Sequence, residues 1–298
     1  MKILVALGGN ALLPPTGKQD PKTYQETVKK TAISLAQLVS NGHGLAITHG
    51  NGPQVGDLLL QQEASKTMRM PLDVLGAETQ GQIGYLLQRE LRNLLPKKEI
   101  YTIITQVIVD PDDPGFKNPS KPVGPFYDVP PQKPGWTVRK LDKGWRRVVP
   151  SPKPVDMVEK AAIIDAFRKG AITIACGGGG IPVVKKGNSL SGVEAVIDKD
   201  MTGAIMASLL NMDLFLMLTD VDGVCLDHGK SSEKLLRSLT LEDAKRLLQS
   251  SELREGSMKP KVQAAFNFVS KNPGKKAVIA SLKDMQKAVE GNAGTVVV

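Results

Sequence analysis

Short apolar runs alternate with amphipathic stretches along almost the whole chain. The runs have the length and the β-branched content of buried strands, and they are Lys2–Leu7, Leu45–Thr48, Ile100–Val109, Ala171–Cys176, Leu214–Thr219, Ala277–Ala280 and Thr295–Val298. The stretches between them have apolar residues at helical spacing and predict helices at about 21–40, 55–65, 75–95, 155–168, 202–210, 260–269 and 284–289, with another from Thr240. This alternation indicates an α/β protein whose sheet is mainly parallel and covered by helices on both faces.

Local signals mark the ends of some of these helices. Asp20 followed by Pro21 predicts a helix start, because Asp is a favourable N-cap and Pro suits the first helical position. Asn41-Gly42 predicts the end of the same helix. Thr240 and Asp243 have the spacing of a capping box, which predicts another start.

Residues 110–154 interrupt the alternation. They hold eleven of the chain's twenty prolines and both tryptophans, Trp136 and Trp145. Proline is excluded from helix interiors and central strands, whereas Asp142-Lys143-Gly144 is typical of a hairpin turn. We therefore expect one domain over residues 1–298 with a small, partly β subdomain inserted at 110–154. A disordered linker is the alternative, but two tryptophans and a hairpin pattern can bury surface.

Positive charge is concentrated in the same segment. The formal net charge is +9, and residues 117–153 contain nine Lys and Arg against two Asp. Such an excess of positive charge suits binding to nucleic acid, to an acidic membrane surface or to small anions.

The apolar runs are too short to span a membrane, and the N-terminus lacks the pattern of a secretory signal. With two cysteines, Cys176 and Cys225, we expect free thiols in a reducing cytoplasm and no zinc site.

Glycine-rich or acidic loops follow four of the predicted strands. These loops are Gly8–Ala11, His49–Pro53, Gly177–Gly180 and Asp220–Gly223. Ligands of open parallel sheets bind beyond the carboxyl ends of the strands, and glycine allows backbone N–H groups to approach an anion closely. One glycine cluster alone is more often a tight turn, and none of the four has the spacing of a Walker A loop. Four of them at successive strand ends favour an anion site.

Two lysines are candidates to neutralise such an anion. Lys199 and Lys261 both stand at predicted helix starts, where the helix dipole disfavours cations unless an anion lies between. Asp200, next to Lys199, could hold the two ammonium groups apart. Solvated surface lysines are the alternative for each one separately. His49 adjoins a glycine loop and is expected to make a structural hydrogen bond, since no Ser-His-Asp or Cys-His arrangement accompanies it.

The chain resembles the carbamate kinases, a branch of the amino-acid kinase superfamily, nearly from end to end. The matching blocks are Ala6–Ala11, Thr48–Gly56, Gly81–Tyr85, Asn118–Tyr127, Ala175–Val183, Val196–Asp200, Leu218–Asp222, Gly256–Met258 and Pro260-Lys261. The first block is shared loosely with amino-acid kinases at large. The Asn51 loop and the block around Lys121 are specific to the carbamate kinase branch.

This resemblance implies a three-layer αβα sandwich, a homodimer, and reversible phosphoryl transfer between carbamoyl phosphate and ADP, with ATP/ADP and Mg²⁺. It implies that the segment 110–154 is a lid that closes over the substrate. The catalytic residues that it implies are Lys199, Lys261, Asp200, Lys121, Gly9 and Asn10. The implied substrate-binding residues are Gly8, Gly50, Asn51 and Gly52. The implied nucleotide-binding residues are Gly178, Asp220, Val221, Asp222, Met258 and Lys261, and no protein metal ligand is implied.

Two other functions fit parts of the sequence. Another amino-acid kinase, acting on acetylglutamate, aspartate, glutamate or UMP, would share the glycine loops, although the Asn51 loop and the Lys121 block argue against it. A nucleic-acid-binding protein would use the basic segment, with Trp136 and Trp145 stacking on bases. That second function leaves the glycine loops unexplained, and a catalytically silent nucleotide sensor has no support in the lysines.

Overall fold

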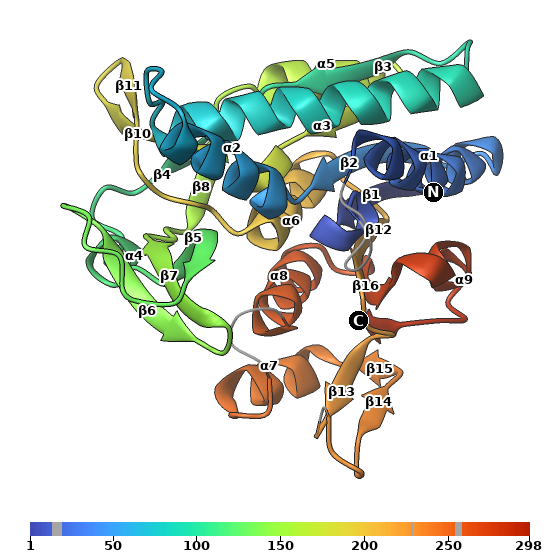
Figure 1. Ribbon diagram of the computed structural model, residues 1–298. Helices are drawn as coiled ribbons and strands as arrows, with labels where there is room; N and C mark the ends of the chain where they lie inside the picture. The colour runs from blue at the N-terminus through green and yellow to red at the C-terminus, as the bar shows by residue number, and fades with distance from the viewer. Residues whose placement is uncertain (14–19, 228, 254–257) are drawn as a thin grey trace.

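A mostly parallel eight-stranded sheet forms the centre of the computed structural model, which describes residues 1–13, 20–227, 229–253 and 258–298 (Figure 1). The strand order is β15-β17-β16-β12-β1-β2-β9-β3. The strands are β1 (Lys2–Leu7), β2 (Gly44–His49), β3 (Ile100–Ile103), β9 (Ile172–Ala175), β12 (Leu214–Thr219), β15 (Ser238–Leu239), β16 (Lys276–Ser281) and β17 (Thr295–Val297). Strand β17 runs antiparallel to β16, whereas the pairs from β16 to β3 are parallel.

Helices cover both faces of this sheet, as the alternation of strands and helices predicts. One core contains Ile3, Val5 and Leu7 of β1, and the other contains Leu4 and Ala6. The first face packs against α1 (Pro21–Ser40), α3 (Leu72–Leu94) and α9 (Met285–Val289), and the second packs against α5 (Lys160–Arg168), α6 (Lys199–Leu209) and α8 (Met258–Lys271). Helix α7 (Leu241–Gln249) packs on α8. The expectation of a three-layer αβα sandwich is confirmed.

The signals at the helix ends are confirmed as well. The Asp20 carboxylate accepts a hydrogen bond from the Thr23 N–H at 2.8 Å, and Pro21 is the first residue of α1. Thr240 and Asp243 form the reciprocal capping box of α7. These two starts depend on contacts within one helical turn, which the sequence specifies locally.

One strand was predicted wrongly, and one helix begins later than predicted. The run Ile100–Val109 is not a single strand, because the chain leaves the central sheet after β3 and forms β4 (Gln106–Val109) in another sheet. Between the two strands, the Thr105 N–H donates to Gln80 Oε1 of α3 at 2.8 Å. The helix expected at 155–168 is confirmed only from Lys160 to Arg168, as α5, because the preceding residues form a strand, β8 (Pro154–Met157).

Two smaller sheets come from segments that the sequence pattern did not resolve. The four-stranded sheet has the order β11-β10-β4-β8 and uses β10 (Ile181–Lys186) and β11 (Ser189–Gly192), which were not predicted. The hairpin of β13 (Val224–Leu226) and β14 (Lys234–Leu236) was also missed. Short 3-10 turns occur at η1 (Gly9–Ala11), η2 (Gly177–Gly179) and η3 (Leu282–Asp284).

Residues 121–149 form a separate antiparallel sheet, which we call the insertion sheet. It has the order β5-β7-β6, with β5 (Lys121–Tyr127), β6 (Thr137–Leu141) and β7 (Gly144–Val149). The turn between β6 and β7 lies at the Asp142-Lys143-Gly144 segment. A short helix, α4 (Pro114–Lys117), precedes the insertion sheet, and β5 packs against α2 (Gly52–Ala64). Figure 1 shows the insertion sheet in green, at the side of the central sandwich.

No helix within the described ranges is long and apolar enough to cross a membrane.

Gly84 is the point of closest approach between α3 and β3. A Cβ atom added at Gly84 would lie 2.1 Å from Thr102 Cγ2, so one of the two elements would have to shift. We expect Gly84→Ala to lower the free energy of unfolding by about 1–3 kcal/mol, as overpacked cores do. Urea denaturation measures this change.

Gly81→Ala is the matched control in the same helix. A Cβ atom at Gly81 would meet no described atom within 4 Å, apart from the backbone of the helix itself. The better helix propensity of Ala should therefore raise stability by up to about 1 kcal/mol. Equal destabilisation by the two substitutions would contradict the role given to the α3–β3 contact.

Candidate active site

A cavity of about 540 Å³ opens at the carboxyl ends of β1, β2 and β12. Loops from both halves of the chain and the first residues of the insertion sheet meet around it. Its lining residues are Gly8, Gly9, Ala11, Gly50, Asn51, Gly52, Val55, Lys121, Pro122, Val123, Gly178, Val196, Ile197, Asp198, Lys199, Asp200, Leu218, Thr219, Asp220, Lys261, Ser281, Leu282 and Lys283. The four loops that follow predicted strands therefore do meet at one edge of the sheet.

The loops after β1 and β2 approach each other at glycines. A Cβ atom at Gly8 would lie 2.9 Å from the Leu218 carbonyl oxygen, and one at Gly50 would lie 3.6 Å from the Gly9 backbone nitrogen. The same position at Gly50 is 3.7 Å from Lys199 Cδ. The glycine backbones thus border the Lys199 side chain, and backbone N–H groups in such loops can donate to an anion.

The loop after β9 packs closely against the loop after β2. Gly178 has a φ of +67°, and a Cβ atom there would lie 2.3 Å from Asn51 Nδ2. Asn51 in turn donates to Thr79 Oγ1 of α3 at 2.9 Å. His49 makes the expected structural hydrogen bond, from its ring Nδ1 to the Gly50 carbonyl oxygen at 3.0 Å. Burial lowers the pKa of His49 to about 4, so its imidazole is neutral at pH 7.

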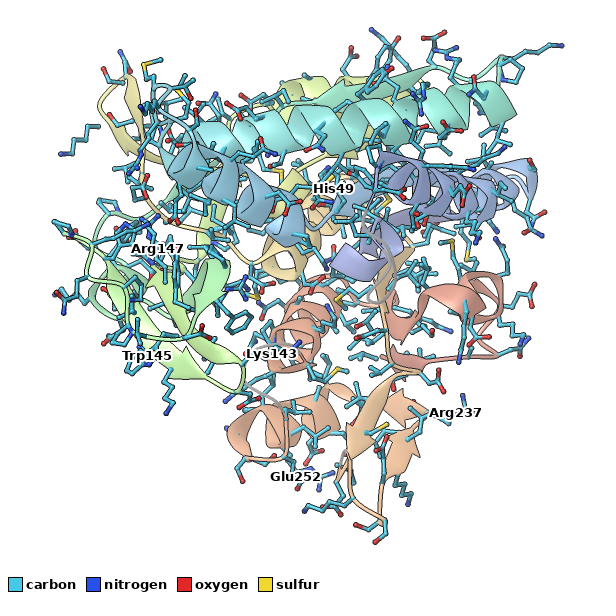
Figure 2. All side chains as sticks on the ribbon, in the orientation of Figure 1. His49, Lys143, Trp145, Arg147, Arg237 and Glu252 are labelled. Carbon is cyan, nitrogen blue, oxygen red and sulfur yellow. The ribbon has the colours of Figure 1, made fainter. Side chains whose placement is uncertain are left out.

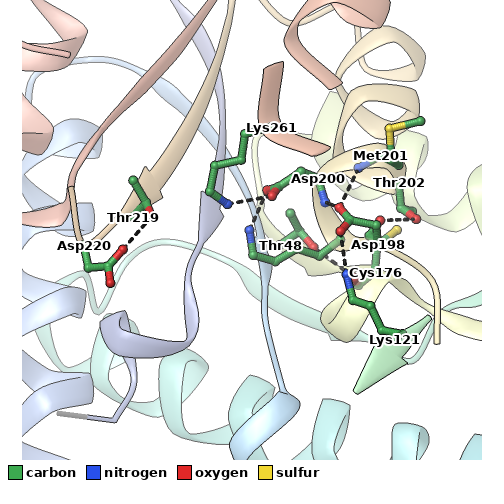
Figure 3. A network of polar contacts seen from close by, with 11 residues as sticks. Thr48, Lys121, Cys176, Asp198, Asp200, Met201, Thr202, Thr219, Asp220 and Lys261 are labelled. Atoms are coloured by element: carbon green, nitrogen blue, oxygen red, sulfur yellow. Dashed lines mark hydrogen bonds and ion pairs between the residues drawn. The ribbon is translucent and has the colours of Figure 1, made fainter. Parts of the chain in front are cut away.

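Lys199, Asp200 and Lys261 form the charged centre of the site, and Figure 3 shows Asp200 and Lys261 side by side. Asp200 Oδ1 accepts from Lys199 Nζ at 2.5 Å, and Asp200 Oδ2 accepts from Lys261 Nζ at 2.7 Å. Asp200 and Lys261 are 3% and 8% exposed, which is rare for charged residues unless they are paired. One carboxylate therefore holds two ammonium groups on its two oxygens, as its position in the sequence suggested.

The three groups shift one another's pKa values. Burial raises the pKa of Asp200, but the two lysines outweigh burial and hold the pKa well below its usual range. Burial lowers the pKa of Lys199, and Asp200 offsets this only in part, with Lys261 lowering it further. For Lys261, burial also lowers the pKa, but Asp200 more than compensates and the pKa is raised. The shared carboxylate thus opposes the effect of burial on the pKa of both lysines.

Asp198 connects this centre to the insertion sheet. Its Oδ1 accepts from the Asp200 backbone N–H at 2.9 Å, which caps the N-terminus of α6. Its Oδ2 accepts from Lys121 Nζ at 2.7 Å (Figure 3). Lys121 is the first residue of β5, so the insertion sheet contributes a third lysine to the cavity.

The residues expected to bind nucleotide are only partly in this cavity. Gly178, Asp220 and Lys261 line it, and Thr219 Oγ1 donates to Asp220 Oδ1 at 3.0 Å. Among the described residues, the lining does not include Val221, Asp222 or Met258. Asp222 instead forms a 3.1 Å ion pair with Lys283. Asn10 lies in η1 next to Gly9.

Two charged residues of the lining were missed as site residues. Asp198 was visible as the residue before Lys199, but its capping role requires the helix to start at Lys199 rather than at Thr202, where it was predicted. Lys283 follows β16 directly, in η3. Its position directly after a predicted strand is the same signal that marked the other four loops.

The site offers no enclosed metal cage within the part of the chain that the structure describes. No group of three or more His, Cys, Asp or Glu side chains there could hold a metal ion. Two of the three lining carboxylates, Asp198 and Asp200, are engaged by lysines on at least one oxygen. The donor set instead consists of ammonium groups and glycine backbone, which favours a polyvalent anion such as a phosphate.

Comparison with known proteins agrees with this geometry. The model of the amino acid kinase family matches residues 1–281. Carbamate kinase of Thermococcus kodakarensis is 47% identical over 312 aligned positions that cover 100% of this chain and 99% of the relative. Carbamate kinase of Halobacterium salinarum is 48% identical over 303 positions, covering 99% of this chain and 97% of the relative.

Solved structures give the same result. Carbamate kinase from Giardia lamblia bound to AMP-PNP has a TM-score of 0.91 and 36% sequence identity, covering 100% of this chain and 98% of that one. UMP kinase from Bacillus anthracis shares only the fold, with a TM-score of 0.55 and 16% identity. The chain belongs to the amino acid kinase family. Within that family, its full-length relatives at 41–48% identity are carbamate kinases, so the resemblance noted in the sequence is confirmed.

We expect Asp200→Asn to destabilise the fold, because two buried ammonium groups would lose their shared carboxylate. Removing one partner from a buried charge cluster typically costs about 3 kcal/mol or more. Urea denaturation at pH 7, in a buffer without phosphate or sulfate, measures the loss. Asp165→Asn, which removes the exposed pair with Lys169, should leave stability almost unchanged.

The pH dependence of this difference has a defined sign. The pKa of Asp200 is depressed in the folded protein, so its stabilising contribution is present above the unfolded pKa of about 4. The part of the gap between wild type and Asp200→Asn that comes from the Asp200 charge should therefore shrink as the pH falls below about 4. A gap that widens below about pH 4 would contradict the assignment.

Proposed function

We propose that this protein is an enzyme that transfers a phosphoryl group reversibly between carbamoyl phosphate and ADP, giving ATP and carbamate. The single observation that carries the proposal is the buried centre in which Asp200 holds Lys199 and Lys261 next to the glycine loops. Phosphoryl transfer requires positioning and charge neutralisation more than covalent chemistry. Ammonium groups and backbone N–H donors supply both.

The proposed substrate does not require a general base in the site. Carbamate is already an anion, so its attack on the γ-phosphate needs no proton acceptor. His49 is neutral at pH 7 and is committed to the Gly50 carbonyl oxygen. In this mechanism Lys199 and Lys261 neutralise charge that develops on the transferred group, and Gly8, Gly9 and Asn10 provide hydrogen-bond donors. Gly50, Asn51 and Gly52 hold the carbamoyl end.

The nucleotide is proposed to lie on the side of the cavity formed by the carboxyl ends of β12 and β16. Asp220 and Lys283 line that side, and Gly178 and Lys261 line the same cavity. Three more residues are proposed to contact the nucleotide beyond the cavity described above: Val221, Asp222 and Met258.

Mg²⁺ would enter with the nucleotide, since it is commonly held by substrate phosphates and one or two carboxylates. Asp220 is the carboxylate of the lining that suits it, and the ion would neutralise phosphate charge.

The segment 110–154 is proposed to act as a lid. Its insertion sheet contributes Lys121 to the cavity, and Pro122 and Val123 line the cavity beside it. When such a lid closes, it would bring the ammonium group of Lys121 next to the anionic substrate and exclude water from the cavity. Lys121 is proposed to leave Asp198 and to bind the phosphoryl group when substrate is present.

A homodimer in the cytoplasm completes the proposal. Strand β3 is the edge of the central sheet, and large apolar side chains lie exposed at and near it, with Tyr85 59%, Tyr101 44% and Ile104 43% exposed. Exposed edges with apolar neighbours are commonly covered by a partner. Cys176 and Cys225 are free thiols, which suits a reducing compartment.

We expect rapid ATP formation from ADP, Mg²⁺ and carbamoyl phosphate, followed by a luminescent readout. Lys199→Ala or Lys261→Ala should lower the turnover number by about 10²–10³-fold, because each removes a charge-stabilising donor. The exposed Lys169→Ala serves as the control and should keep full activity.

Circular dichroism must show that both variants remain folded. Well-folded wild-type protein that makes no ATP would refute the proposed reaction, and acetylglutamate, aspartate, glutamate and UMP would then be tested with ATP. Full activity of either lysine variant would refute the mechanism while leaving the reaction intact.

The dimer is tested separately by light scattering after size-exclusion chromatography. Wild-type protein should have twice the 32.0 kDa chain mass, and Tyr101→Glu should shift it to the monomer by placing a charge at the sheet edge. Val129→Glu, an exposed position in the insertion, should have no effect. A wild-type monomer would contradict the proposal.

A further inference from the structure

One face of the insertion sheet is turned towards the body of the molecule. In the β5–β7 pairing, Lys121 is opposite Val149 and Val123 is opposite Arg147. Cross-strand partners, and residues two apart on one strand, share a face of the sheet. Lys121, Val123, Arg147 and Val149 therefore belong to one face. Val123 and Val149 pack in a small apolar cluster with Val55 of α2 and Leu72 of α3.

Residues 193–198, which connect β11 to α6, run along this face, and we call them the strap. Val196 is in the middle of the strap and packs against the same apolar cluster. Its backbone N–H donates to the Pro150 carbonyl oxygen at 3.0 Å, just beyond β7. The strap thus contacts the insertion sheet through its backbone as well as through apolar side chains.

Two carboxylates of the strap make the same pair of contacts. Glu194 Oε1 accepts from the Leu72 N–H at 2.7 Å, at the N-terminus of α3, and Glu194 Oε2 accepts from Arg147 Nη2 at 2.7 Å. Asp198 likewise caps α6 with one oxygen and holds Lys121 with the other. Each carboxylate therefore joins a helix of the body to a cation of the insertion sheet.

The two ion pairs differ in whether they line the cavity. Lys121 and Asp198 line the cavity, whereas Arg147 and Glu194 do not belong to the described lining. Arg147 is only 13% exposed and its guanidinium stacks 4.7 Å from the Trp136 ring centre. Figure 2 shows Arg147 at the end of the insertion sheet nearer to α2, away from Lys143 in the hairpin turn. Its contact with Glu194 fixes the sheet without touching the cavity.

We propose that Glu194 and Arg147 are positioning residues, which hold the insertion sheet in the register that puts Lys121 into the cavity. The inference rests on the proposed function, because it concerns the delivery of Lys121 to the substrate. A shift of the sheet by a few ångströms would take Lys121 out of hydrogen-bond range of Asp198 and of an anion in the cavity. Glu194 acts on the reaction through Lys121 alone.

Glu194→Gln tests this role with little change of shape. The glutamine oxygen can still accept from the Leu72 N–H, but its amide N–H groups then face Arg147 and cannot accept from it. We expect kcat/KM for carbamoyl phosphate to fall roughly fivefold, the effect of losing one partly exposed ion pair. Arg147→Gln should give a similar fall, and Asp165→Asn, which breaks the exposed pair on α5, should give none.

The decisive comparison uses Lys121→Ala as a background. If Glu194 acts through Lys121, then Glu194→Gln causes no further loss of kcat/KM when Lys121 is already absent. An equal loss in both backgrounds would show a general structural effect and would overturn the proposal. A Glu194→Gln enzyme as active as Asp165→Asn would overturn it too.

A fluorescence measurement keeps the test independent of activity. Both tryptophans of the chain, Trp136 and Trp145, belong to the insertion, so tryptophan emission, excited without the tyrosines, reports on this part of the protein alone. Quenching by acrylamide should increase in Glu194→Gln relative to Asp165→Asn, and unchanged quenching would count against the proposal. A wild type without ATP formation would refute the proposed reaction, whereas the quenching result would still decide whether Glu194 holds the sheet.

Discussion

The bidentate contact of Asp200 with two lysines is the constraint on which the rest of the site depends. Two ammonium groups beside each other in a buried cavity repel strongly, and the shared carboxylate makes their proximity tolerable. The contact also joins separate parts of the chain, since Lys199 begins α6 and Lys261 lies in the first turn of α8. Both helices must pack on the same face of the sheet for the three groups to meet. The position of these helices is therefore coupled to the electrostatics of the site.

The sequence predicted best what depends on neighbouring residues. The bounds of β1 and β12 and the starts of α1 and α7 agree with the prediction, because apolar runs and caps are specified within a few residues. Strand β8 and the break between β3 and β4 were predicted wrongly. Both depend on partners far along the chain, such as Gln80 for Thr105 and β4 for β8. Hydrophobic periodicity contains no information about which sheet an apolar run will join.

For the site, the sequence indicated which lysine and aspartate residues take part, and the structure added the hydrogen bonds and ion pairs between them. The family resemblance and the glycine loops pointed to Lys199, Lys261, Asp200 and Lys121, and all four meet in one cavity. Asp198 and Glu194 went unnoticed because a single acidic residue in a loop has no distinctive pattern. Their importance arises from bonding in two directions at once, to a helix N-terminus and to a distant cation. Such a double contact becomes visible only in three dimensions.

The pairing of two lysines with one carboxylate has a consequence for measurements of stability. Two lysines share the single carboxylate of Asp200, and Lys121 pairs with Asp198 in the same cavity. A polyvalent anion that binds between these lysines in the folded state would add to its stability by mass action. We therefore expect phosphate or sulfate in the buffer to raise the apparent melting temperature. Melting temperatures of variants of this protein are then comparable only at one anion concentration.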